Sequence, residues 1–290
     1  MSWRTVVITS NAKLDYQLGC LVVRKDKVTK IHLSEVSVLL IESTAVSMTA
    51  VLLNALIEKK IKVIFCDEKR NPSAELVPYY GCHDSSQKMR SQIRWSEGMK
   101  EAVWTEIVTE KIRQQAELLE NIGRQESNLL EEYIEELEPG DATNREGHAA
   151  KVYFNALFGM DFSRSSMNSI NAALNYGYGI LLSAFNREIA ANGYLTQLGL
   201  FHDNMFNHFN LGSDLMEPFR PLVDRIVYGM MPDKFEKEEK LRVLSVLNEE
   251  VWIGNKREYV NNAIRTYCKS VFDAIEEQDV SMIRFYRNEL

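Results

Sequence analysis

The chain of 290 residues contains few cysteines and no long apolar run. Its four cysteines, Cys20, Cys66, Cys82 and Cys268, are too scattered for a zinc site or a disulfide framework. No uncharged apolar segment approaches the roughly 18 residues of a membrane span, and the N-terminus runs directly into a strand-like segment rather than a signal peptide. We therefore expect a protein of the reducing cytoplasm that neither crosses a membrane nor carries a standard secretion signal.

Positive charge is also in deficit, because 34 lysines and arginines face 41 aspartates and glutamates, which gives a net charge of -7. This balance argues against a protein that coats nucleic acid non-specifically, although DNA affinity depends on local basic strips and not on the sum over the chain. The content of 45% hydrophobic and 26% charged residues is typical of a globular protein with one large or two modest domains.

The first 66 residues favour a small β-rich domain. Aliphatic and β-branched runs typical of short strands lie at residues 6–9, 21–23, 28–33, 36–41 and 62–66. Apolar residues at three- and four-residue steps predict one amphipathic helix between residues 47 and 59. Residues 67–85 lose this periodicity and carry Asn71-Pro72, Pro78 and Gly81, so we predict an interdomain linker there.

Residues 86–290 are predicted to form a larger, all-helical domain, since apolar positions recur at helical spacing along most of this length. The chain is therefore expected to be of the α+β class. Six basic residues are scattered along the first of these helices: Arg90, Arg94, Lys100, Lys111, Arg113 and Arg124. We interpret each of them as part of a solvated helix face, with a DNA track as the alternative.

The densest group of chemically active side chains lies in residues 199–224, GLFHDNMFNHFNLGSDLMEPFRPLVD. Ser213 is suited to cap a helix that begins near Asp214. At 3.6 residues per turn, Asp214, Glu217 and Asp224 share one face of it, and two prolines predict an irregular first turn. Three carboxylates on one face repel one another unless positive charge compensates them. Arg220 supplies part of that charge, and a hard divalent cation could supply the rest.

Simpler interpretations compete with a metal site at each of these positions. An acidic helix face is usually only solvated, and the helix macrodipole favours acids at a helix start without any function. A single histidine near a helix start is more often a core or capping residue than a ligand, and the stretch contains both His202 and His208. Upstream, Thr143-x-x-Glu146 matches a capping box, in which Glu146 would only bond a backbone N–H.

Five motifs carry a resemblance that covers essentially the whole chain. They are WRTVV from residue 3, IHLSEVSVLLIE from 31, VIFCDEKRNP from 63, REGHAAKVYF from 145 and DLMEPFRP from 214. With these motifs the chain resembles the universal CRISPR-associated endonuclease and integrase that captures new spacers, and more specifically its type II-A branch. The resemblance implies a β-sandwich-like domain (1–66), a linker (67–85) and a helical catalytic domain (86–290).

The resemblance also implies a metal site. The glutamate of the REGHAAK motif is a metal ligand in the family, and here it is Glu146. The family pattern places the histidine ligand fifteen residues before Glu217, which selects His202 over His208. Glu146, His202 and Glu217 would then be the catalytic residues and would hold one Mg²⁺ or Mn²⁺ ion.

The reaction implied is insertion of captured DNA into a CRISPR array, by attack of a DNA 3′-hydroxyl on a phosphodiester. Arg220 would bind a scissile or neighbouring phosphate through its fork of donors. Asp214 and Asp224 would support the metal ligands from outside the coordination shell.

The partners implied are double-stranded DNA, as prespacer and as CRISPR leader–repeat, and a second copy of the chain. Two such homodimers would flank the small companion protein of spacer acquisition in a heterohexamer, and the type II-A branch would add its effector nuclease and a ring-forming accessory protein. Two other functions stay open from the residues alone. One is a metal-dependent endonuclease that uses water as nucleophile, and the other is a non-catalytic helical scaffold.

Overall fold

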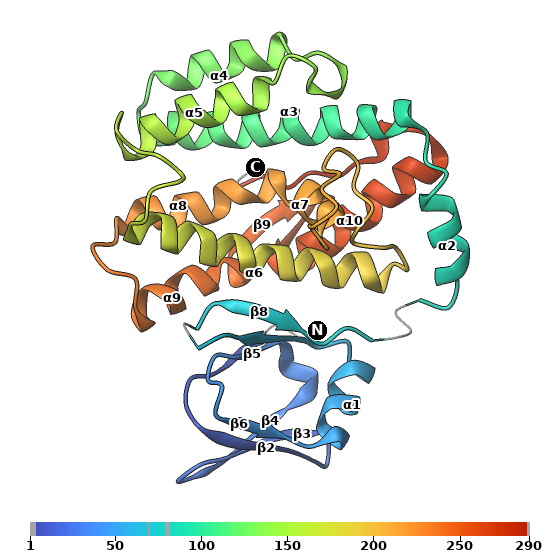
Figure 1. The fold of residues 1–290 in the computed structure, drawn as a ribbon, viewed down its shortest axis with the longest axis vertical. Coiled ribbons are helices and arrows are strands. Elements are labelled where there is room, and N and C mark those ends of the chain that lie inside the picture. Colours follow the sequence, from blue (N-terminus) through green and yellow to red (C-terminus); the bar gives the residue numbers. More distant parts are fainter. Residues whose placement is uncertain (1–3, 69, 79–81, 289–290) are drawn as a thin grey trace. The chain divides into compact units, whose positions relative to one another are not determined.

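The structure, a computed structural model, describes residues 4–68, 70–78 and 82–288. The chain forms two compact units, Met1–Gly81 and Cys82–Leu290, each with its own hydrophobic core (Figure 1). The first is rich in strands and the second in helices, which confirms the predicted α+β class.

Two four-stranded sheets make up the first unit. One has the order β1 (Arg4–Ile8), β5 (Val36–Ile41), β7 (Lys62–Cys66) and β8 (Pro72–Glu75), and the other has the order β4 (Val28–His32), β3 (Cys20–Arg24), β2 (Ala12–Gln17) and β6 (Val46–Met48). The first sheet is parallel except for β8, whereas β2, β3 and β4 run antiparallel. A 3-10 turn, η1 (Leu33–Glu35), and one helix, α1 (Ala50–Glu58), complete the unit.

Both sheets and α1 share one apolar core. Leu14 and Leu21 come from one sheet, Leu39 from the other and Leu52 from α1, and all four are fully buried. Each such side chain stabilises the fold by about 1.5–3 kcal/mol. Every residue of β5 is buried, as expected for a strand in the middle of a sheet.

Three strands of this unit escaped prediction: β2, β6 and β8. Strand β2 lies between the predicted runs at 6–9 and 21–23, and a two-residue hairpin turn, in which Leu18 and Gly19 have φ of 48° and 78°, joins it to β3. Strand β8 lies inside the predicted linker and pairs with β7, so residues 67–85 do not act wholly as a linker. Its Pro72 is tolerated because β8 is an edge strand.

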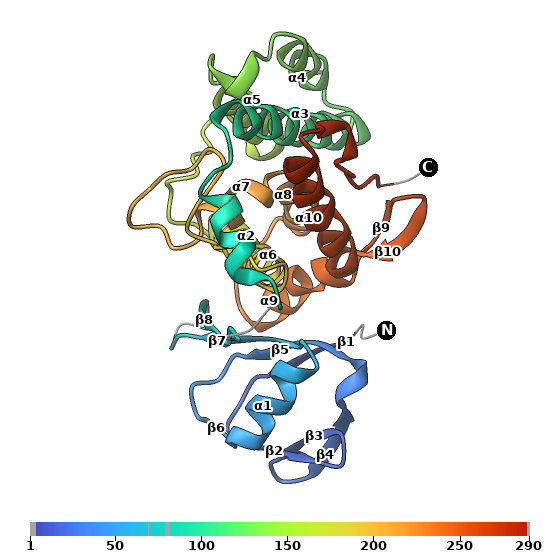
Figure 2. The same ribbon diagram turned by 90° about the vertical axis from the view of Figure 1, so that its right-hand side faces the viewer.

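The second unit is built on helices. They are α2 (Ser85–Gln92), α3 (Glu97–Asn121), α4 (Glu126–Glu135), α5 (Arg145–Phe158), α6 (Ser169–Ala191), α7 (Asn210–Leu215), α8 (Arg220–Met230), α9 (Lys237–Leu244) and α10 (Val260–Glu277), with 3-10 turns η2 (Pro139–Asp141), η3 (Glu217–Phe219), η4 (Ser245–Asn248) and η5 (Val280–Met282). Helix α3 packs on α4 and α5 along one side and on α8 and η3 along the other (Figures 1 and 2). Within the described residues, no helix has the length and apolarity that crossing a bilayer requires.

The prediction of an all-helical second domain is wrong in one place. Strands β9 (Glu250–Ile253) and β10 (Lys256–Tyr259) form an antiparallel hairpin just before α10. Its turn residues Gly254 and Asn255 have φ of 55° and 62°, the left-handed pair that a two-residue hairpin needs. The short strands EVWI and KREY around this turn were the available sequence signal.

Candidate active site

The acidic stretch does not form the single helix face that its spacing predicts. Helix α7 begins at Asn210, and the Ser213 N–H donates to Phe209 O inside it, so Ser213 is not an N-cap. Pro218 follows Glu217 in the 3-10 turn η3, which confirms the irregular geometry expected from the prolines. Asp214, Glu217 and Asp224 therefore lie on three successive elements, α7, η3 and α8, and each has its own partners.

Asp214 organises the loop that carries His202. Its carboxylate is fully buried and accepts hydrogen bonds from the backbone N–H groups of Leu200 (2.6 Å), Phe201 (3.1 Å) and His202 (3.2 Å). The imidazole Nδ1 of His202 donates to the same carboxylate. A Cβ at Gly199 would overlap His202 O and lie 2.7 Å from Asp214 Oδ2, so only glycine fits there.

This arrangement fixes the chemistry of the His202 ring. Because a carboxylate accepts, Nδ1 carries the hydrogen and Nε2 is the nitrogen left for a ligand. The hydrogen bond that His202 donates to Asp214 raises the pKa of His202 above its ordinary value, against the opposing effect of partial burial. Phe201 stacks on Trp104 with ring centroids 4.5 Å apart, which holds the loop on α3.

Glu146 is not a helix cap. The start of α5 is capped by Asp141, whose carboxylate accepts from Arg145 N at 2.6 Å and from Glu146 N at 3.1 Å. Thr143 lies in the turn before the helix, and the N-cap position is Asn144. The capping-box interpretation is therefore wrong, and the side chain of Glu146 is used elsewhere.

Lys111 of α3 joins the carboxylates of Glu146 and Glu217. Its Nζ donates to Glu146 Oε1 and to Glu217 Oε2, although the two glutamates lie on elements far apart in the chain. The Lys111 side chain is only 7% exposed and that of Glu217 only 5%. Burial alone would lower the pKa of Lys111, but the charges of Glu217 and Glu146 outweigh burial and raise it.

Arg220 completes the charge balance around Glu217. Its Nε donates to Glu217 Oε1 at 2.8 Å, and its guanidinium lies over the Tyr178 ring, 4.5 Å from the centroid. Burial works against an ionised Glu217, but Arg220 and Lys111 together hold the pKa of this carboxyl down to about 2. Glu217 is therefore charged at every physiological pH.

The interpretation of Lys111 as a residue on a solvated face is wrong. It lies four residues after Ile107, three after Val108 and four before Gln115, all of them buried. The available signal was therefore a lysine on the apolar stripe of a helix, where an unpaired charge is rarely placed. What the sequence could not supply was the identity of its partners, which the fold brings in from α5 and η3.

These side chains open into a cavity of about 200 Å³. It is lined by Lys111, Gln115, Glu146, Ala150, Phe154, Arg164, Tyr178, Glu217, Arg220 and Asp224. Asp224 accepts hydrogen bonds from Tyr153 Oη at 3.0 Å and from Tyr178 Oη, and burial raises the pKa of Asp224 to about 6 even though both bonds oppose the rise. Gln115 Oε1 is buried but accepts no hydrogen bond from the described residues.

The donor set suits a hard divalent cation. Two carboxylates converge on one cationic point, and an acceptor without a partner among the described residues lies on the same cavity wall. His202, whose Nε2 is left for a ligand, is not among the residues that line this cavity. In this structure, however, Glu146, His202 and Glu217 do not come within 4.8 Å of one another as a set of three. The positive point between the two glutamates is the Lys111 ammonium.

One set of three potential ligands does meet this limit in the described part of the chain: Cys82, His83 and Asp84. They are consecutive residues before α2, and the Cys82 thiol donates to Asp84 Oδ1 at 2.6 Å. Neighbouring positions in the chain explain their closeness, and no residue from another element joins them.

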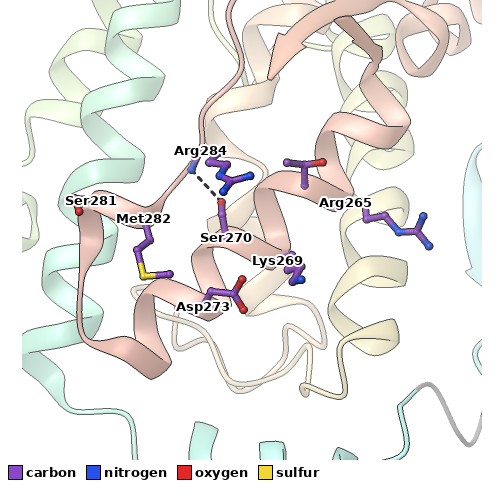
Figure 3. A pocket seen from close by; sticks show the side chains of 8 residues that line it. Arg265, Lys269, Ser270, Asp273, Ser281, Met282 and Arg284 are labelled. Carbon is purple, nitrogen blue, oxygen red and sulfur yellow. Dashed lines mark hydrogen bonds between the residues drawn. The ribbon is translucent and has the colours of Figure 1, made fainter. Parts of the chain in front are cut away.

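A larger hollow of about 490 Å³ lies beside α10. Figure 3 shows its lining, in which Arg265, Lys269 and Arg284 accompany a single acidic residue, Asp273. The Arg284 N–H donates to Ser270 Oγ at 3.0 Å. Because it lacks a pair of convergent acids, we assign the candidate active site to the smaller cavity.

Comparisons with known proteins concern the chain as a whole. A family profile described as CRISPR associated protein Cas1 matches residues 5–250. The CRISPR-associated endonuclease Cas1 of Neisseria meningitidis serogroup C (strain 8013) is 37% identical over 229 residues, which cover 78% of this chain and 75% of that protein.

Two solved structures show the same fold. A casposase bound to integration product matches with a TM-score of 0.78 and 15% identity, over 97% of this chain and 93% of that chain. A chain of a Cas6-RT-Cas1–Cas2 complex matches with a TM-score of 0.72 and 19% identity, over 97% of this chain but only 36% of the other, so this chain spans about a third of its length.

Proposed function

The chain belongs to the family described as CRISPR associated protein Cas1, and from that premise we propose that it is a metal-dependent DNA integrase that inserts captured spacer DNA into a CRISPR array. The observation that carries the proposal is the convergence of Glu146 and Glu217 on one buried point of a cavity that Arg220 also lines. The name of the casposase structure, which holds an integration product, supports the same kind of reaction.

Glu146, Glu217 and the Nε2 of His202 are the groups that would hold Mg²⁺ or Mn²⁺. When bound, the ion would supply Lewis acidity to the phosphodiester and charge for the attacking and leaving oxygens. The Glu217 carboxylate is already ionised for this purpose, since its pKa is about 2. Asp214 keeps the imidazole in the tautomer that leaves Nε2 free.

Arg220 has a second task in this proposal. Its Nε is used by Glu217, but its terminal nitrogens form no hydrogen bond among the described residues, and its side chain is 26% exposed. These donors are suited to hold a phosphate beside the carboxylates. Asp224 remains outside the ligand set, since Tyr153 and Tyr178 both donate to it, and it supports the wall under Arg220.

The proposed reaction conserves phosphodiester bonds. The 3′-oxygen of the captured DNA forms a bond to phosphorus, the bond from that phosphorus to the 3′-oxygen of the array strand breaks, and the proton of the attacking hydroxyl ends on the leaving oxygen through solvent. No covalent link to the protein forms. The work of the protein is positioning and charge stabilisation.

We extend the proposal to partners. The substrates are double-stranded prespacer DNA and the leader–repeat junction, and the chain acts as a homodimer that joins a small companion protein in a heterohexamer. The name of the matched Cas6-RT-Cas1–Cas2 complex supports the companion protein. Cooperation with a type II-A effector nuclease and a ring-forming accessory protein stays a prediction, since the matched relatives carry no branch name.

A metal-dependent endonuclease that uses water is the second candidate. The name of the Neisseria relative, CRISPR-associated endonuclease Cas1, favours endonuclease activity. A non-catalytic scaffold is the third, but it loses its main argument because Asp141 and not Glu146 belongs to the cap of α5.

The deciding experiment is strand transfer with blocked ends. The protein, its companion and Mn²⁺ are incubated with a plasmid that carries leader and repeat, and with a short duplex ending in 3′-hydroxyl or in dideoxy residues. Joined products that disappear with dideoxy ends support the integrase. Nicking that ignores the ends would replace it with the endonuclease, and absence of any metal-dependent reaction would leave the scaffold.

A variant pair ties the reaction to the site. Glu217→Gln removes a charged ligand at nearly constant shape and should abolish joined products, whereas Glu131→Gln, at an exposed position of α4, should leave them unchanged. Joined products at the normal rate from Glu217→Gln would contradict the assigned site.

A further inference from the structure

Lys111 occupies the position between the two proposed carboxylate ligands. Its Nζ donates to one oxygen of Glu146 and to one of Glu217; the side chains of Lys111 and Glu217 are buried, and that of Glu146 is partly buried. Two carboxylates this close, one of them buried, are disfavoured without a cation between them, because like charges repel and burial removes solvation. Lys111 therefore does in this state what a metal ion would do in the proposed active state.

Two cations cannot use the same two oxygens at once. A divalent ion at Glu146 and Glu217 would repel the ammonium at close range, so Lys111 must leave its present position. Its four-carbon stem is flexible, and the cavity of about 200 Å³ beside it gives the side chain room to turn.

The structure also contains an acceptor for the displaced ammonium. Gln115 lies one helical turn after Lys111 on α3, lines the same cavity and is only 2% exposed. Its Oε1 is buried without a hydrogen-bond donor among the described residues, which is a costly state for a carbonyl oxygen. Residues four apart on a helix are neighbours, so Lys111 Nζ can reach this oxygen.

We propose that Lys111 is a built-in counter-ion of the site, which pairs with Glu146 and Glu217 in the absence of a divalent cation and moves to Gln115 Oε1 when one binds. This inference rests on the proposed function, because it takes the two glutamates as metal ligands. It makes Lys111 a positioning residue and a competitor of the metal, not a ligand and not a group that contacts DNA.

The test measures Mn²⁺ binding directly, by the electron paramagnetic resonance signal of free Mn²⁺ during titration of the protein without DNA. Lys111→Met keeps the length of the side chain and removes its charge. Its Mn²⁺ affinity should rise about 10- to 100-fold, because Mn²⁺ no longer has to displace an ammonium before it binds Glu146 and Glu217. Lys111→Gln should shift the affinity in the same direction, and it serves as the second variant if Lys111→Met folds poorly.

Thermal unfolding is an independent readout. Without metal, Lys111→Met should melt below the wild type, since the buried Glu217 and the partly buried Glu146 have lost their shared cation. Saturating Mn²⁺ should then raise its melting temperature by more than it raises that of the wild type. The control is Lys240→Met, which removes an equally buried lysine that lies over the rings of Tyr176 and Phe235, and it should leave Mn²⁺ affinity unchanged.

Gln115→Leu tests the second position of the ammonium. It should weaken Mn²⁺ binding several-fold in the wild-type background, because the displaced Lys111 finds no acceptor there. It should have no effect in the Lys111→Met background, where nothing is displaced, so the two substitutions are non-additive.

These binding measurements distinguish a failure of the counter-ion proposal from a failure of the proposed function. If the wild type binds Mn²⁺ and Glu217→Gln does not, the metal site stands, and unchanged or weaker binding by Lys111→Met overturns the counter-ion alone. If the wild type, Lys111→Met and Lys111→Gln all fail to bind Mn²⁺, the metal site and the counter-ion both fall.

Discussion

Replacement of Asp214 by asparagine is the sharpest test of how the histidine loop is held. Its two carboxylate oxygens accept four hydrogen bonds: Oδ2 from the N–H groups of Leu200 and Phe201, and Oδ1 from the backbone N–H and Nδ1 of His202. Asparagine has the same shape, so Asp214→Asn leaves no cavity. It has only one acceptor oxygen, however, and its amide group turns a donor toward two of the four donors.

The expected cost follows from that count. Two hydrogen bonds to a charged acceptor are lost, each worth about 1.5–3 kcal/mol, and relief from burying a charge offsets part of the loss. We expect the free energy of unfolding to fall by about 3 kcal/mol. For a unit of this size the melting temperature should fall by roughly 6–12 °C.

The assays are urea unfolding and a nuclear magnetic resonance titration of His202. Without the charged acceptor, the pKa of His202 should return toward its ordinary value of about 6.5. Metal affinity should fall about 10- to 100-fold, as is usual when the partner of a ligating histidine is removed. Asp203→Asn, at an exposed position of the same loop, is the matched control. A melting temperature within 1 °C of the wild type, together with an unchanged His202 pKa, would refute the reasoning.

Three further predictions concern stability. The folded pKa of Asp224 is about 6, above its ordinary value of 3.8, so the stability that this group contributes is full below pH 3.8 and is lost as the pH rises through 6. The free energy of unfolding of Asp224→Asn, relative to that of the wild type, should therefore rise by about 3 kcal/mol between pH 3 and pH 7, as measured by urea unfolding. Gly177→Ala places a methyl group against Val223 and should lower the free energy of unfolding by about 1–3 kcal/mol. Gly98→Ala meets open space and should stabilise α3 by up to about 1 kcal/mol, so equal effects of the two substitutions would contradict the close packing at Gly177. Asp141→Ala removes two hydrogen bonds at the start of α5 and should cost about 1–2 kcal/mol in unfolding free energy, and no loss would restore the capping box.

The sequence predicted what depends on neighbours in the chain. The prolines predicted the irregular turn at Glu217, because proline acts on its own backbone. The aliphatic runs at β5 and β7 were found for the same reason.

What the sequence could not supply depends on contacts across the fold. Lys111 looked like one more helix-surface lysine, because its partners are 35 and 106 residues away. Asp141, which precedes the capping box expected at Thr143, caps α5 instead. The turn around Asn144, with φ of 53°, brings the Asp141 carboxylate to the helix start. Local propensity favoured the nearer residue, and the geometry of the turn decided otherwise.

The separation of these contacts along the chain also bears on how the molecule is made. The contact from Lys111 to Glu146 closes a loop of 35 residues, and the contact to Glu217 closes one of 106. Loop-closure entropy makes the longer contact about 1 kcal/mol harder to form in an otherwise unstructured chain, so we expect the contact to Glu146 to form before the contact to Glu217. During synthesis, a growing chain that has not yet released residue 217 from the ribosome holds only one of the two acids. Until residue 217 has emerged, such a chain cannot form the contact between Lys111 and Glu217.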